Sequence, residues 1–385
     1  VLSLESVACK DWLTNKVDRC VTGRIAQQQT VGEIQLPLSN CGVVSLDYDN
    51  YNGVATSIGH SPITGLINPS IGSINSIGES LTNIIWAPLA DGIKSISLSA
   101  NWMWPCGNEG EDSRLYDAVS ACSRFAIELG INIPTGKDSL SMVQKYDSIK
   151  VKSPGTVIIS ASGHCEDVRK VVKPVLNKNI GDIYYIDMSF DELKLGGSSF
   201  AQTQNKIGTN APTINDSKKF KDAFDLVQNL IRANKIKSGH DISSGGMITT
   251  LLELCFSSDK IGMDIDLTEI GCSDTVKLFF SENAGLIIQS ESDLNTEFSR
   301  IGVSCFKIGR INKDGLLNIK NFESDFSFNI DKYRDVWFST SRDFDKIQTK
   351  NNKGVERFEN YKEQPLNFIF PKYLKLNVNP DIKKN

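Results

Sequence analysis

The sequence predicts an α+β protein of two domains. Apolar strand patterns alternate with amphipathic helix patterns up to about residue 165, and a second mixed set runs from about 183 to 330. At 385 residues the chain is long enough for about two domains with a core each. We therefore expect an N-terminal linker at 1–38, domains at 39–170 and 171–330, and a tail at 331–385.

Each element of the first domain follows from a local pattern. Residues 1–38 are polar and irregular, which is why we expect a linker there. The alternating segments 43–48 and 54–59 predict a hairpin around a turn at 49–53. Apolar residues at helical spacing predict helices over 72–90 and 113–129, the second closed by Gly130. Strands are expected at 95–102 and 156–162.

The second domain repeats this mixture. Strands are expected at 183–187, 261–267 and 305–311, and helices at 220–234, at 247–256 and within 290–301. The apolar segments 277–280 and 286–289 bracket a turn at 281–285. Beyond residue 330 the chain looks extended with scattered aromatic residues, so we expect a packed tail or linker.

Composition excludes several classes of function. A net charge of −4 and a pI of about 5.6 do not favour nucleic acid or an anionic membrane as partner. No apolar run reaches the roughly 18 residues of a spanning helix, and no secretory signal is present. Nine scattered cysteines without a C-x-x-C motif indicate reduced thiols, so we expect a cytoplasmic protein. Because the chain begins without Met, we expect a piece of a longer one.

The segment 240–246, His-Asp-Ile-Ser-Ser-Gly-Gly, leads directly into the helix pattern at 247–256. A helix N-terminus offers unpaired N–H groups and a positive dipole end, and Gly245 and Gly246 let an anion such as phosphate approach them. Asp241 could hold a cation that bridges phosphates. The alternative, and the more common use of such a segment, is an N-cap formed by Ser243 or Ser244.

A second candidate pair is Glu79 and Asn83, which lie four residues apart on the helix predicted at 72–90. This spacing puts both side chains on one helix face. A carboxylate and an amide oxygen suit a hard cation such as Mg²⁺. The alternative is an exposed polar stripe.

The segment 135–139, Thr-Gly-Lys-Asp-Ser, is not a P-loop. Ile131 and Asp138 stand where that motif needs Gly and Ser or Thr. Gly136, Lys137 and Ser139 still offer backbone access, a charge and a hydroxyl to a phosphate. A phosphate-contacting turn and a purely structural turn both remain open.

Taken together, these segments resemble the synthetase region of the phosphoribosylformylglycinamidine synthase family. The resemblance is carried, in the family's order, by 36–44, 78–83, 98–103, 107–119, 134–142, 195–202 and 240–246. It covers most of residues 10–330. It implies the α+β fold of aminoimidazole ribonucleotide synthetase, whose first domain contributes to a β-barrel-type interface, and it implies the second of two pseudo-symmetric halves.

The resemblance also implies an activity. Members of the family are ATP-dependent ligases of purine biosynthesis, which use glutamine-derived ammonia to convert formylglycinamide ribonucleotide into its amidine. The implied cofactors are Mg²⁺ and ATP or ADP. The implied partners are the N-terminal synthetase half and a glutaminase domain, in the same or a separate chain. The glutaminase nucleophile would lie outside this chain, so no catalytic residue is assigned.

Individual residues carry over by position. The implied metal ligands are Asn40, Glu79, Asn83 and Asp241, the nucleotide contacts are Ser39, Gly136, Lys137, Ser243, Gly245 and Gly246, and Ser139 is a substrate contact. Asn40 and Ser244 stand where many relatives have Asp, which removes negative charge and weakens metal binding. Two alternatives stay open: a nucleotide-binding half without turnover, and another ATP-using enzyme such as aminoimidazole ribonucleotide synthetase.

Overall fold

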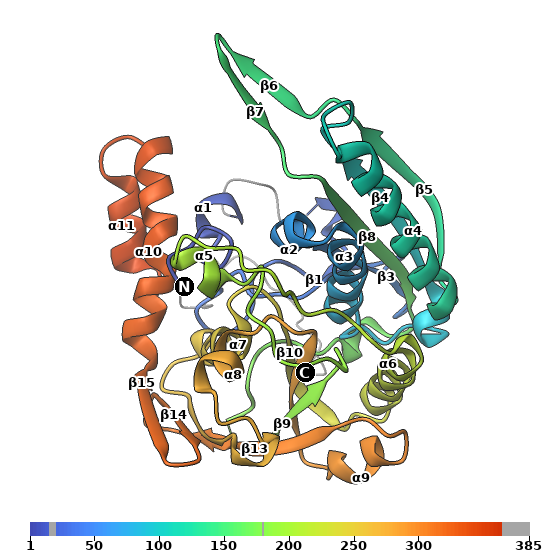
Figure 1. The fold of residues 1–385 in the computed structure, drawn as a ribbon. Helices are drawn as coiled ribbons and strands as arrows, with labels where there is room; N and C mark the ends of the chain where they lie inside the picture. Colours follow the sequence, from blue (N-terminus) through green and yellow to red (C-terminus); the bar gives the residue numbers. More distant parts are fainter. Residues whose placement is uncertain (15–20, 179–180, 364–385) are drawn as a thin grey trace.

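The computed structural model describes residues 1–14, 21–178 and 181–363, which fold around two mixed sheets (Figure 1). The first sheet has the order β1-β2-β3-β8-β4-β5. Its strands are β1 (Ile25–Gln27), β2 (Gly42–Ser45), β3 (Gly53–His60), β4 (Ile96–Met103), β5 (Asn132–Ser139) and β8 (Thr156–Cys165). Helices α3 (Pro69–Ile84) and α4 (Glu111–Leu129) lie together along this sheet, and α3 packs against β3 and β8.

Local sequence explains the elements that surround α3. The β3 strand alternates buried with exposed or half-buried residues, as expected for one face against a core. The α3 helix starts where Asn68 accepts hydrogen bonds from the backbone N–H groups of Ser70 and Ile71, with Pro69 in the first turn. It ends at Ile84, earlier than predicted, while α4 ends at Gly130 in the left-handed conformation, as predicted.

The second sheet has the order β10-β12-β9-β13-β11-β14-β15. Its strands are β9 (Asp182–Asp187), β10 (Ile236–Ile242), β11 (Gly262–Asp266), β12 (Gly285–Ser290), β13 (Cys305–Asn312), β14 (Leu316–Asn321) and β15 (Ser324–Asn329). The accompanying helices are α5 (Ser199–Thr203), α6 (Ser217–Arg232), α7 (Gly246–Phe256), α8 (Thr275–Phe280) and α9 (Leu294–Ser299). All of β12 is buried, so this strand lies at the centre of the domain.

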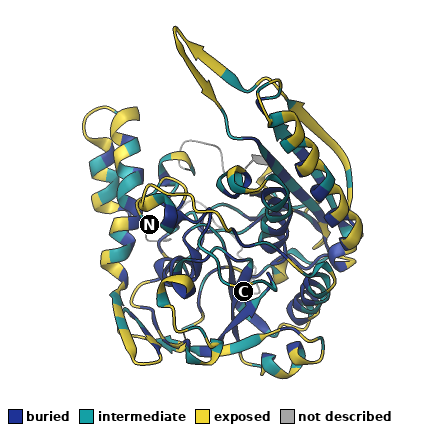
Figure 2. Cartoon of the chain, viewed as in Figure 1, coloured by how far each residue is buried: buried dark blue, intermediate teal, exposed yellow. Residues whose placement is uncertain are grey.

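The remaining elements are short or peripheral. A largely exposed hairpin, β6 (Val143–Tyr146) and β7 (Ile149–Lys152), projects from the first domain (Figures 1 and 2). Short helices are α1 (Asp11–Thr14), α2 (Pro62–Ile67), η1 (Val21–Gly23), η2 (Gly92–Ser95), η3 (Val168–Lys170) and η4 (Thr268–Ile270). Within the described ranges, no helix combines the length and the apolar character needed to cross a bilayer.

Two segments differ from expectation, and the apolar segment 277–280, for which only the turn after it was predicted, is helical. The segment beyond residue 330 is not extended: it forms α10 (Ile330–Gln348) and α11 (Lys353–Asn360), with Trp337 and Phe338 of α10 buried. Residues 277–280 are helical because Asp274 caps α8 by accepting from the backbone N–H of Lys277. Segment 135–139 is not a turn but part of the edge strand β5.

The N-terminal segment, expected as a linker, packs against the C-terminal helices. The Asp11 carboxylate accepts hydrogen bonds from Arg357 Nε at 3.0 Å and from its Nη2 at 2.9 Å. The Trp12 ring stacks on Phe344 with centroids 4.9 Å apart, and the Trp337 indole N–H donates to the backbone oxygen of Val7. These contacts join the two ends of the described chain into one packed unit.

We expect Asp11→Ala to lower the free energy of unfolding by about 2 kcal/mol, because it leaves the partly buried Arg357 guanidinium without its two-pronged acceptor. Urea unfolding followed by circular dichroism measures the effect. Asp49→Ala, in an exposed turn, is the control and should stay within about 0.5 kcal/mol of wild type. Equal losses in both variants would contradict the role of this ion pair.

Candidate functional site

Helix α3 brings Glu79 to the junction of the two domains. Glu79 Oε1 accepts a hydrogen bond from Ser243 Oγ at 2.9 Å, and Oε2 accepts from the backbone N–H of His60 at 2.8 Å. One turn later, Asn83 Nδ2 donates to the backbone oxygen of Glu79 at 3.0 Å. Burial raises the pKa of Glu79, and the nearby Asp241 charge adds to that rise. The predicted residues Glu79, Asn83, Ser243 and Asp241 therefore lie in one neighbourhood.

Asp241 lies in a buried charge cluster that the sequence did not reveal. Its Oδ1 contacts His240 Nδ1 at 3.1 Å, and His240 Nε2 lies 3.4 Å from Glu253 Oε2. Burial alone would lower the pKa of His240, but its hydrogen bonds to the two carboxylates outweigh burial and raise the pKa to about 10. His240 is therefore an imidazolium held between two carboxylates at neutral pH.

This cluster predicts how stability depends on pH. Since the folded pKa of His240, about 10, exceeds the ordinary 6.5, its stabilisation is complete below pH 6.5 and is lost as pH rises through 10. In EDTA, we expect the free energy of unfolding to fall by on the order of 3 kcal/mol across that window. Urea titrations at several pH values measure it, with His240→Gln as the comparison. Parallel curves for the two proteins would contradict the assignment.

Asp241 Oδ2 and Asn40 Oδ1 are among the buried oxygens of the described residues that have no hydrogen-bond partner, and both belong to predicted metal ligands. Asn40 Nδ2 donates to the backbone oxygen of Gly239 at 3.2 Å, which places Asn40 beside the strand that carries Asp241. A buried oxygen without a partner costs about 1–3 kcal/mol unless a donor or a cation satisfies it. In the described chain no cluster of three His, Cys, Asp or Glu side chains is placed to hold a metal ion. A cation here would need amide as well as carboxylate oxygens, which Mg²⁺ accepts.

Two cavities adjoin this junction. The smaller, of about 250 Å³, is lined by Glu79 and Ser243 together with Ser244, His60 and Glu282. The larger, of about 900 Å³, is lined by Ser39, Asn40 and Asn83 together with residues of the first sheet. Ser39 Oγ accepts from Gln27 Nε2 at 2.7 Å, which fixes it at the wall of the larger cavity. Five of the predicted site residues thus line these cavities, while Asp241, Gly245 and Gly246 line neither.

The residues predicted on segment 135–139 lie elsewhere. Gly136, Lys137 and Ser139 line neither cavity, and Lys137 Nζ donates to Ser139 Oγ at 2.6 Å on the exposed edge strand. A Cβ at Gly136 would overlap the backbone oxygen of Ala100 on the neighbouring strand β4. Close strand pairing therefore explains the glycine.

The glycines before α7 also have a structural use. Gly245 and Gly246 have φ angles of 97° and 72°, a region that favours glycine. The Gly245 N–H donates to Glu282 Oε1 at 2.7 Å, and the Gly246 N–H donates to the backbone oxygen of Ser243 at 3.0 Å. Neither Ser243 nor Ser244 caps the helix, since its N-cap is Gly245 without a side-chain cap. The N–H groups of both glycines are therefore occupied from within the chain.

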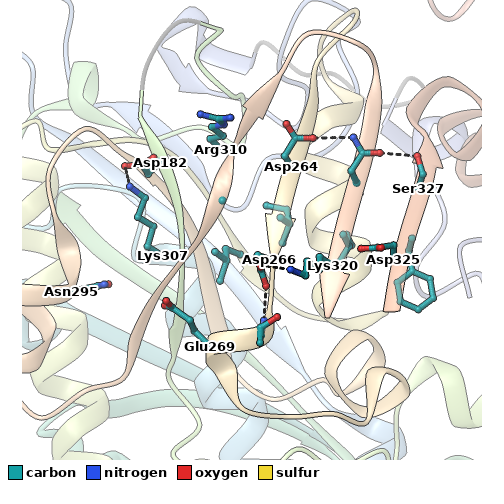
Figure 3. Close-up of a pocket in the computed structure, with 17 residues that line it drawn as sticks. Asp182, Asp264, Asp266, Glu269, Asn295, Lys307, Arg310, Lys320, Asp325 and Ser327 are labelled. Atoms are coloured by element: carbon teal, nitrogen blue, oxygen red, sulfur yellow. Dashed lines mark hydrogen bonds and ion pairs between the residues drawn. The ribbon is translucent and has the colours of Figure 1, made fainter. Parts of the chain in front are cut away.

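A third and larger cavity, of about 1090 Å³, lies on the face of the second sheet (Figure 3). Two ion pairs lie along its strands, Asp182 with Lys307 at 2.6 Å and Asp266 with Lys320 at 3.9 Å. Asp264 accepts from Asn318 Nδ2 at 2.9 Å. None of the predicted site residues lines it, so we assign the site to the domain junction.

Fold and junction together define the class: an α+β protein of the aminoimidazole ribonucleotide synthetase type. Residues 9–164 match the FGAR-AT PurM_N-like domain, and residues 183–320 match the C-terminal domain of AIR synthase related proteins. The chain is homologous to a segment of phosphoribosylformylglycinamidine synthase, as the following relatives show.

The similarity extends along most of the chain. The chain is 39% identical to the probable phosphoribosylformylglycinamidine synthase, chloroplastic/mitochondrial, of Arabidopsis thaliana. The match covers 90% of this chain and 25% of the Arabidopsis thaliana protein. Identity to the phosphoribosylformylglycinamidine synthase of Homo sapiens is 32%, over 94% of this chain and 28% of that one. The chain thus spans about a quarter of the length of these relatives, and the predicted resemblance is confirmed.

Solved structures share the fold. Thermotoga maritima PurL complexed with FGAR matches with a TM-score of 0.61 and 13% identity, over 77% of this chain and 48% of that one. The same protein complexed with ADP matches with a TM-score of 0.59 and 11% identity, over 81% of this chain and 48% of that one. At this identity the match confirms the predicted fold class alone.

Proposed function

We propose that this chain is part of a phosphoribosylformylglycinamidine synthase, which converts formylglycinamide ribonucleotide into its amidine with ATP and glutamine-derived ammonia. The observation that carries the proposal is a pair of buried oxygens without partners, Asp241 Oδ2 and Asn40 Oδ1, together with a cavity of about 900 Å³ that Asn40 lines. That volume suits a nucleotide. The names of the Thermotoga maritima complexes, with ATP, ADP and FGAR, support the same ligands.

The chain's own side chains fit Mg²⁺. Asp241 and Asn40 would supply oxygens that have no other partner, and Glu79 and Asn83 lie close enough in the fold to contribute. When bound, Mg²⁺ offsets the negative charge of nucleotide phosphates. Ser39 and Asn83 would contact the nucleotide from the wall of the larger cavity, and Ser243 would hold Glu79 from the smaller one.

Calorimetry with Mg²⁺ and ADP, on the protein with its flanking regions present, tests the proposal. We expect binding in the wild type and affinity at least about 10-fold weaker in Glu79→Ala. Gly136→Ala is unsuitable as a control because it disturbs strand pairing, so Lys137→Ala, on the exposed edge strand, serves instead. Absence of binding, or equal affinity in all three proteins, would contradict the site.

A second function, a nucleotide-binding half without turnover, is favoured by two observations. Asn40 is neutral and uses its amide N–H₂ to contact Gly239, and both N–H groups before α7 are occupied internally. Such a site offers fewer charged groups and free N–H donors to stabilise the charge that develops in a transition state. Assaying the isolated chain with ammonia, ATP and formylglycinamide ribonucleotide separates the two functions. Amidine formation would contradict the structural role.

Regions beyond this chain complete the proposal. The relatives are about four times longer than the part they share with it. We infer that an N-terminal synthetase half and a glutaminase domain supply the remaining substrate contacts and the ammonia. We propose the cytoplasm as the location of the protein. Because the name of the Arabidopsis thaliana relative gives chloroplast and mitochondrion, cell fractionation should compare these compartments with the cytoplasm.

A further inference from the structure

Glu282 joins two loops that lie far apart in the sequence. It follows α8, and its Oε1 accepts hydrogen bonds from the backbone N–H of Gly245 at 2.7 Å and of Ser199 at 2.8 Å. The first donor belongs to the loop 243–246 before α7, and the second belongs to the first turn of α5. A single carboxylate oxygen therefore ties the starts of two helices together.

Both loops form walls of the smaller cavity. Ser243 and Ser244 line it from one loop, and Gly196 and Gly197 line it from the other. Glu282 itself lines the cavity between them. Fixing these two loops therefore fixes the width of the cavity.

Neither loop has a conformation that most residues adopt freely. Gly245 has a φ of 97° and Gly197 a φ of 79°. A Cβ at Gly245 would overlap the Thr249 side chain, and one at Gly197 would come within 2.7 Å of Thr64 Oγ1. Two backbone hydrogen bonds to one buried side-chain oxygen limit the movement of the two loops relative to each other. Glu282 thus provides the cross-link that two conformationally permissive glycine loops need.

We propose that Glu282 is a positioning residue that holds the loops 195–199 and 243–246 at the distance the smaller cavity requires. It acts through the two backbone N–H groups and needs no contact with a ligand. The occupant of the cavity rests on the proposed function, and we take it to be part of the ribonucleotide substrate. The cross-link itself is independent of that assignment.

Hydrogen–deuterium exchange on the wild type, Glu282→Ala and Glu282→Gln tests the cross-link directly. In Glu282→Ala, we expect peptides covering Ser199 and Gly245 to exchange at least about 10-fold faster together, because both lose their shared acceptor. Glu282→Gln keeps one oxygen and should exchange within about 3-fold of wild type. Glu128→Ala, exposed on α4, is the matched control and should leave both peptides unchanged.

If Glu282→Ala does not fold, Ser199→Pro and Ser199→Ala replace it. Proline removes the N–H donor at the first position of α5, where its fixed φ is tolerated, and Ser198 already has φ −67° and ψ 155°, as a residue before proline prefers. Because Ser199 is fully buried, urea unfolding must first show that the proline variant keeps its fold. Ser199→Pro should speed exchange of its own loop by about 10-fold, and Ser199→Ala should not. Unchanged exchange in Glu282→Ala or Ser199→Pro would overturn the proposal, as would equal acceleration in Glu282→Gln.

Calorimetry with formylglycinamide ribonucleotide then links the cross-link to the cavity. We expect affinity about 10-fold weaker in Glu282→Ala and recovered in Glu282→Gln. Loss in both variants alike would overturn the positioning role in favour of a role for the charge. A wild type that binds no ribonucleotide would contradict the proposed function, while the exchange result would still decide the cross-link.

Discussion

Asp241→Asn is expected to weaken binding of Mg²⁺ with ADP by about 100-fold in the protein with its flanking regions. The substitution keeps the shape of the side chain but removes its charge and replaces one oxygen by an N–H₂ group that cannot ligate a cation. Asp241 Oδ2 is the buried oxygen without a partner, while Oδ1 already contacts His240. The loss should therefore fall on metal binding, measured by calorimetry at several Mg²⁺ concentrations.

Asp225→Asn is the matched control. Asp225 is a partly buried carboxylate that accepts from the backbone N–H of Ile93, away from both junction cavities. Its asparagine variant should bind Mg²⁺ and ADP within about 3-fold of wild type. If Asp241→Asn also remains within that range while still folding, Asp241 is not a metal ligand and the fit of the two unpaired oxygens to a cation is wrong.

Local periodicity predicted those parts of the fold where one face is apolar and the ends carry a clear signal. The hairpin of β2 and β3, the helix that ends at Gly130 and the buried strand β8 were all predicted within a few residues. Local periodicity failed for α10, whose aromatic residues look scattered in the sequence. In the structure the Trp337 indole donates to Val7 of the N-terminal segment, and Phe338 stacks on Tyr361. The first of these contacts joins positions more than 300 residues apart, which no local window contains.

In the site, too, contacts between residues far apart in the sequence could not be predicted from local patterns. A spacing of four residues placed Glu79 and Asn83 together, and the resemblance brought Ser243 and Asp241 to them. The role of Glu282 was not predictable, because its partners at 199 and 245 are backbone N–H groups that leave no residue pattern. For the same reason the glycines before α7 were interpreted as an anion site, although a carboxylate of the chain occupies the N–H of Gly245.

Gly59→Ala is expected to lower the free energy of unfolding by about 3 kcal/mol. Gly59 is buried on β3, where a Cβ would overlap the backbone oxygen of Ser76 and the backbone N of Ser80 on α3. Backbone atoms inside a helix cannot turn away as a side chain can, so the whole helix must move from the sheet. That helix carries Glu79, which His60 holds at 2.8 Å from the next position of the strand. The variant should therefore lose Mg²⁺ and ADP affinity as well as stability, measured by urea unfolding and calorimetry.

Gly42→Ala, in the neighbouring strand β2, separates this contact from a general cost of changing a strand glycine. The nearest atom to a Cβ there is the Thr56 hydroxyl at 3.4 Å, which can give way, so we expect a change within about 1 kcal/mol. Equal destabilisation by both variants would show that the distance between β3 and α3 is not limiting. Gly59→Ala could also lose stability and keep its nucleotide affinity. That result would show that Glu79 still binds after its helix has moved, and that the hydrogen bond from His60 does not position the site.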